Sequence, residues 1–129
     1  MTAAAAATTS DADGPAEAPG HVNDVHLVGR LSAEPVSREM PSGDVMMSFR
    51  LVVERPPTRK KAARGPTVDT LDCAVWRKDL QRSLRAVSPG DVLEVSGALR
   101  RRFWRSPGGP VSRSEVEVSR LRRARRATA

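Results

Sequence analysis

Apolar side chains occupy alternate positions over much of the chain, which is the pattern of a half-buried β-strand. The pattern first appears between Val25 and Leu31, and Pro35 follows its end. Turn-forming residues separate four later segments of the same kind, so five strands are predicted in all. The predicted strands cover residues 25–31, 45–53, about 68–76, 91–104 and about 111–121.

One segment between the third and fourth predicted strands has helical spacing instead. Leu80, Leu84 and Val87 stand at intervals of four and three, which predicts a short helix over residues 77–87, and the Ser-Pro-Gly sequence at residues 88–90 terminates it. Five strands with one helix in this place are the element order of an all-β, five-stranded OB-fold barrel, which often binds single-stranded nucleic acid through one exposed face. An irregular sandwich has the same order, and the pattern alone does not exclude it.

The two ends of the chain differ in composition from the strand-rich part. Residues 1–20 contain no Leu, Ile, Val or aromatic side chain, so they cannot bury enough surface to order themselves and are predicted to form a disordered arm. The alanine run in this arm has no basic start, so a secretory signal is not expected and a cytoplasmic location is. Residues 21–121 are predicted to form one OB-fold domain, and residues 122–129 a short basic tail.

The chain is strongly basic. It has 22 Lys and Arg against 15 Asp and Glu, a formal net charge of +7. The positive charge gathers in the loop at residues 56–67, which has no acid, and in the C-terminal third. This distribution suits a polyanion such as nucleic acid or an anionic surface, although a solvated basic face has the same composition.

Little in the sequence suggests catalysis, a metal or a membrane. Cys73 is the only cysteine and alternates with core residues, so it is expected to be a small buried hydrophobe. His21 and His26 flank Asp24, but no third strong ligand stands nearby, and no metal or other cofactor is expected. No stretch approaches the roughly 20 apolar residues of a membrane helix. The chain is therefore not expected to be an enzyme or to take a small-molecule substrate.

Trp104 and Trp76 are the candidates for contact with nucleic-acid bases. Trp104 follows Arg100 and Arg102 at intervals of two, so all three should project from one face of a strand. Bases can stack on such a ring while the arginines meet phosphates. Alternatively, Trp104 caps the barrel end. Trp76 lies on the polar side of the third strand, where its partner is either a base or the helix.

The other aromatic and basic residues receive simpler interpretations. Phe49 lies among core positions, and Phe103 has the core parity of its strand, so both are expected to be structural. The remaining side chains expected to neutralise phosphate are Arg50, Arg77, Lys78 and Arg105 and, in the loop, Arg59, Lys60, Lys61 and Arg64.

Several short stretches, in order and with matching spacing, resemble the bacterial single-stranded DNA-binding proteins. Residues 22–31 resemble the opening strand of that family, 49–52 the second strand, 74–90 the third strand and helix, and 97–104 the fourth strand. The resemblance covers about residues 22–121. It implies an OB-fold, usually a homotetramer, that wraps single-stranded DNA without sequence preference in replication, repair and recombination. It also implies that Trp76 and Trp104 are the stacking aromatics.

The sequence departs from the family pattern in ways that should weaken binding. The family has further stacking aromatics near Pro57 and Thr70, where this chain has none, and it often has a base where this chain has Asp72. The C-terminal residues 121–129 are basic, whereas the main replication member ends in an acidic tip that recruits partner proteins. We therefore expect a secondary or divergent paralogue that does not recruit proteins in this way, and whose basic tail either adds phosphate contacts or is a frayed, solvated end.

The sequence thus favours a non-enzymatic protein that binds and protects single-stranded DNA. Two alternatives stay open. The missing aromatics and Asp72 suit an OB-type protein-interaction subunit with little affinity for nucleic acid. An RNA-binding OB module would have the same pattern of exposed aromatic and basic residues.

Overall fold

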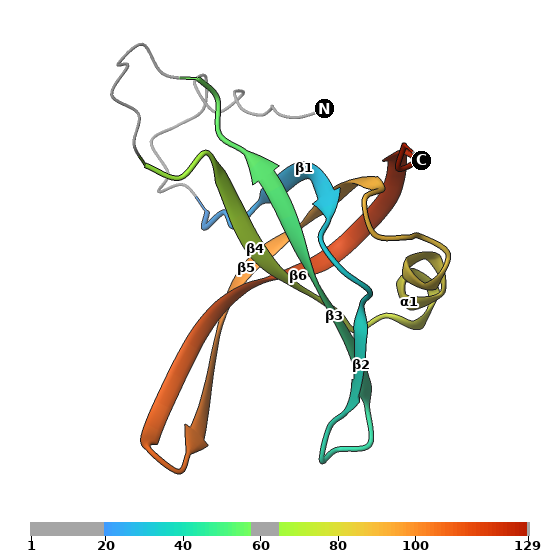
Figure 1. Cartoon of the computed structure of the whole chain (residues 1–129). Helices are drawn as coiled ribbons and strands as arrows, with labels where there is room; N and C mark the ends of the chain where they lie inside the picture. The colour runs from blue at the N-terminus through green and yellow to red at the C-terminus, as the bar shows by residue number, and fades with distance from the viewer. Residues whose placement is uncertain (1–19, 58–64, 129) are drawn as a thin grey trace.

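Six β-strands and one helix make up the part of the chain that the computed structural model describes, residues 20–57 and 65–128 (Figure 1). The elements are β1 (Val25–Leu31), β2 (Val36–Glu39), β3 (Val45–Glu54), β4 (Val68–Val75), α1 (Lys78–Arg85), β5 (Val92–Ser106) and β6 (Gly109–Arg125). The helix lies between the third and fourth of the five long predicted strands, as expected. Apart from Gly20, the predicted disordered arm is outside the described residues.

Five of the strands close into a barrel. The order around it is β1, β5, β6, β4 and β3, and β3 returns to β1 through the pairs Arg30 with Val52 and Leu31 with Leu51. The pairing of β4 with β6 is parallel, and the others are antiparallel. This closed five-stranded barrel with one helix confirms the predicted OB-fold.

The barrel interior is filled by the apolar positions of the alternating pattern. Phe49 and Cys73 are buried as predicted, with 5% and 1% of their surface exposed. The helix adds Leu80 and Leu84 to the same core. Gln81 anchors the helix, because its buried amide nitrogen donates to two backbone carbonyl oxygens, that of Val45 at the start of β3 and that of Val75 at the end of β4.

Two hairpins extend from the barrel on the same side (Figure 1). One is formed by β2 and β3, and β2 was absent from the sequence prediction because all four of its residues are exposed and show no alternation. The other is formed by β5 and β6, which pair as far as Ser106 and Gly109 at the turn. β5 changes register at Gly97, where any side chain would collide with the backbone carbonyl of Glu117.

Phe103 is not a structural residue, and the prediction for it is wrong. Its side chain is 74% exposed. Phe103 does have the parity of the core positions Leu93 and Val95, but at this point β5 has left the barrel and pairs only with β6. Parity fixes the face of the strand, and here that face has no core to cover.

The C-terminal segment is held on the barrel. The last strand was predicted to end at Leu121, but β6 continues to Arg125 and pairs with the start of β5. The following backbone amide of Ala127 donates to Asp91, 2.7 Å away, and the amide of Ser88 donates to the same carboxylate. The first part of the predicted basic tail is therefore strand and is not frayed.

Asp91→Ala should lower the melting temperature by about 5 °C at pH 7, because two backbone amides lose their acceptor. These amides, and secondarily Arg123, hold the pKa of the Asp91 carboxyl below its usual range. The stabilisation is therefore present above pH ~4 and is lost as the pH falls through the lowered pKa, so the two melting curves should converge in acid. Circular dichroism melts at pH 7 and pH 3 measure this. Glu54→Ala, at the exposed end of β3, is the control and should melt as the wild type does. If Asp91→Ala and the wild type have the same melting temperature at pH 7, the prediction is wrong.

Candidate nucleic-acid interface

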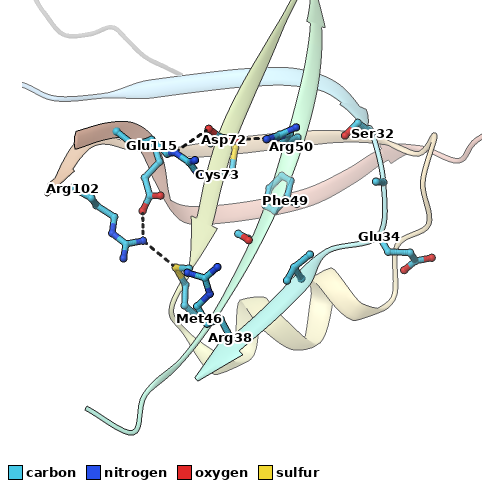
Figure 2. Close-up of a pocket in the computed structure, with 14 residues that line it drawn as sticks. Ser32, Glu34, Arg38, Met46, Phe49, Arg50, Asp72, Cys73, Arg102 and Glu115 are labelled. Carbon is cyan, nitrogen blue, oxygen red and sulfur yellow. Dashed lines mark hydrogen bonds and ion pairs between the residues drawn. The ribbon is translucent and has the colours of Figure 1, made fainter. Parts of the chain in front are cut away.

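A groove lies between the two hairpins. Its outer part, of about 450 Å³, is lined by residues 38–41 from the β2–β3 hairpin and by Arg102, Trp104, Arg113 and Glu115 from the β5–β6 hairpin. Its inner part, of about 390 Å³, shares four of these side chains and reaches the outer surfaces of β3 and β4 (Figure 2). We refer to both parts together as the hairpin groove.

Trp104 lies in the outer part of this groove with 42% of its surface exposed. The guanidinium carbon of Arg113 lies 5.8 Å from the centre of its ring, a cation–π contact. Trp104 pairs with Val111 in the projecting half of the hairpin and does not join the buried core cluster. The alternative that it caps the barrel is therefore wrong, and the ring is open to a ligand in the groove.

Trp76 shares an outward face with Trp104. Arg100, Arg102 and Trp104 alternate along β5 and point to the outside of the sheet, as the sequence predicts. Half-buried Trp76 follows the end of β4 and lines a hollow of about 320 Å³ together with Arg100 and Glu117. The structure therefore places both tryptophans, with the two arginines between them, along one surface.

The arginines on this surface already have carboxylate partners. Arg50 donates to Asp72 at 3.1 Å, and Arg102 lies 3.4 Å from Glu115. Figure 2 shows Arg102 between Glu115 and Met46, whose sulfur also accepts a hydrogen bond. Sequence reasoning missed Glu115, although its spacing of two from Glu117 in the last strand was a signal that both face the same way.

Two further pairs of this kind lie beside Trp76 and within the hairpin groove. Arg100 donates to Glu117 at 2.7 Å, and Arg113 approaches Asp72 at 4.0 Å. The hairpin groove is thus lined by four arginines and four carboxylates, namely Arg38, Arg50, Arg102 and Arg113 with Glu34, Glu39, Asp72 and Glu115. Its positive charge is compensated locally, so a phosphate has to compete with protein carboxylates for these guanidinium groups.

The other predicted phosphate contacts are dispersed. Arg77 is held by Asp79 at 2.7 Å, and this contact lowers the pKa of the aspartate. Lys78 is exposed at the first position of α1. Arg105 is exposed on the hairpin face opposite Trp104. The predicted loop contacts Arg59, Lys60, Lys61 and Arg64 lie outside the described residues.

Other titratable groups near the barrel are engaged in structural roles. Burial, and secondarily the charges of Asp72 and Glu115, raises the pKa of the Cys73 thiol to about 12, so this sulfur is protonated at neutral pH. His26 lies 2.7 Å from Glu94. Within residues 20–57 and 65–128, no three His, Cys, Asp or Glu side chains are grouped as a metal would need, and no helix there could cross a membrane.

Comparison with known proteins gives a consistent result. The model of the single-strand binding protein family matches residues 22–124. Single-stranded DNA-binding protein 1 of Synechocystis sp. is 30% identical over 102 residues, which are 78% of this chain and 81% of that protein. The single-stranded DNA-binding protein of Deinococcus radiodurans is 28% identical over 112 residues, 86% of this chain. This match spans only 37% of the Deinococcus protein, so much of that relative has no counterpart here.

Solved structures show the same fold at lower identity. A structure described as the Plasmodium falciparum SSB complex with ssDNA superposes with a TM-score of 0.68 at 21% identity, covering 81% of this chain and 96% of that one. A mitochondrial single-stranded DNA-binding protein of S. cerevisiae gives a TM-score of 0.64 at 12% identity, covering 84% of this chain and all of the other. At these identities the two structures support the barrel architecture alone.

Proposed function

Because the chain belongs to the single-strand binding protein family, we propose that it binds single-stranded DNA without sequence preference. The observation that carries the proposal is the exposed ring of Trp104 in a groove lined by arginines. An aromatic face next to cationic groups can stack any base and hold the backbone, since every base has a π-face. Trp76 supplies a second ring on the same outward surface.

The ion pairs give this binding a particular character. Arg50, Arg100 and Arg102 are positioned by carboxylates before a ligand arrives. Binding then exchanges a carboxylate for a phosphate at each site, and the electrostatic gain is smaller than for free arginines. Stacking on the tryptophans should therefore supply an unusually large share of the affinity.

The wider role that we propose follows the family. The protein would act as a homo-oligomer, as a tetramer, and would protect DNA strands exposed during replication, repair or recombination in the cytoplasm, where such strands arise. It would bind and release DNA without catalysing a reaction.

A fluorescence titration with oligothymidylate tests the proposal. We expect tryptophan emission to be quenched at low salt, because bases stack on Trp104 and Trp76. The affinity should fall with salt with a log–log slope of about −2, which corresponds to roughly three neutralised phosphates on a single strand. Unchanged emission at low salt rejects the proposal and favours a protein-interaction subunit. The pairing of the groove arginines with carboxylates would then agree with a low affinity for nucleic acid. Preference for a matched RNA oligomer would assign the protein to RNA instead.

A further inference from the structure

The β5–β6 hairpin has a second face, opposite Trp104, that the proposed function leaves largely unused. Leu99, Arg101, Phe103 and Arg105 alternate along β5 on this face. Their partners on β6 are Val116, Ser114, Ser112 and Pro110. None of these eight side chains is acidic, so this face lacks the carboxylates that compensate the arginines around Trp104.

Phe103 is the most exposed aromatic side chain among the described residues. Its exposed fraction is 74%, against 42% for Trp104, and the guanidinium carbon of Arg101 lies 6.0 Å from the centre of its ring. A phenyl ring left in water is unfavourable, because apolar surface gains free energy when it is covered. The ring is therefore available to a planar ligand, and a nucleobase is one.

The charge on this face distinguishes among possible ligands. Arg101 and Arg105 form no ion pair within the part of the chain that the structure describes, whereas Arg100 and Arg102 each have one. A phosphate backbone would neutralise the two free arginines. A second copy of this chain, with its net charge of +7, would add positive charge beside them.

We propose that Phe103, Arg101 and Arg105 form a second contact site for single-stranded DNA. A strand stacked on Trp104 passes around the hairpin and continues along the opposite face, where a base stacks on Phe103. This inference rests on the proposed function and extends the DNA path beyond the groove. It predicts that the two faces are used together only by strands long enough to reach both.

Phe103→Ala tests the inference on oligothymidylates of about 8 nucleotides, which is within the range of site sizes of one OB fold, and of about 24 nucleotides, which is beyond it. We expect the affinity for the long strand to fall about fivefold and that for the short strand to stay unchanged. Phe103→Tyr should keep the long-strand affinity, since it retains the ring, and Phe103→Leu should lose it. Ser112→Ala, opposite Phe103 on the same face, is the matched control.

The arginines provide an independent measurement. The double variant Arg101→Gln, Arg105→Gln should make the log–log salt slope for the long strand shallower by about 1.4, the value for two phosphates. If Phe103→Ala binds both strands as the wild type does, the inference is wrong, while retained tryptophan quenching shows that the proposed function stands. If Phe103→Leu keeps wild-type affinity and Phe103→Ala changes the mass in light scattering, the face contacts protein and the inference is overturned.

Discussion

Trp104→Ala should lower the affinity for oligothymidylate about 10- to 100-fold, because a base loses its stacking platform in the hairpin groove. The loss should be almost the same at low and high salt, since stacking carries no counterion release. The melting temperature should stay close to that of the wild type, because the ring is 42% exposed and outside the core.

Anisotropy of a dye-labelled oligonucleotide is the suitable measurement, because removing one of the 2 tryptophans changes the protein emission. Trp104→Phe should recover most of the affinity, and Val111→Ala, the cross-strand neighbour, should leave it unchanged. Wild-type affinity for Trp104→Ala would show that this ring does not stack bases. Residual quenching in the variant reports Trp76 alone, and therefore separates the two platforms.

The barrel could be predicted from the sequence because each of its strands has one buried face. Leu31, Leu51 and Leu93 each belong to the alternating apolar positions of a different strand and are almost fully buried, so the period of two was visible in each strand. β2 has no buried residue, so no pattern marked it. Alternation records the presence of a core, and it is absent wherever two strands pair away from one.

Phe103 shows the limit of the same reasoning. Its parity agreed with Leu93 and Val95, but parity does not reveal how far a hairpin projects beyond the barrel. Projection depends on the length over which β5 and β6 pair, and that length is fixed by backbone hydrogen bonds, which leave no mark in composition. An aromatic assigned to packing thus became the most exposed ring among the described residues.

The ion pairs of the groove could be predicted only with knowledge of the register between the strands. The sequence placed Arg100, Arg102 and Trp104 on one face, and the structure agrees. It could not show that Glu115 and Glu117 face them, because this depends on the tight turn at Gly109 and on the unbroken register that runs from this turn to Gly97.

Asp72 holds two arginines of the hairpin groove and is the residue whose removal should raise DNA affinity most. Its carboxylate lies 3.1 Å from Arg50 and 4.0 Å from Arg113, and it is one-third exposed. In the free protein this charge occupies guanidinium groups that a phosphate would otherwise contact. Asp72→Asn should therefore increase the affinity for oligothymidylate about tenfold at low salt and steepen the log–log slope by about 0.7 to 1.4, for one or two more phosphates.

The control for this variant has to match its change in net charge. Glu94→Gln does so, because Glu94 also pairs with two basic side chains, His26 and Arg122, but lies outside the hairpin groove. If the affinity for oligothymidylate rises equally in both variants, the change in net charge explains the effect and Asp72 has no special role. If Asp72→Asn binds more weakly than the wild type, the carboxylate serves to hold Arg50 and Arg113 in position for phosphate, and competition is the wrong account. A rise in affinity that is confined to Asp72→Asn and is largest at low salt would show that the carboxylate of Asp72 lowers the affinity of the groove for DNA.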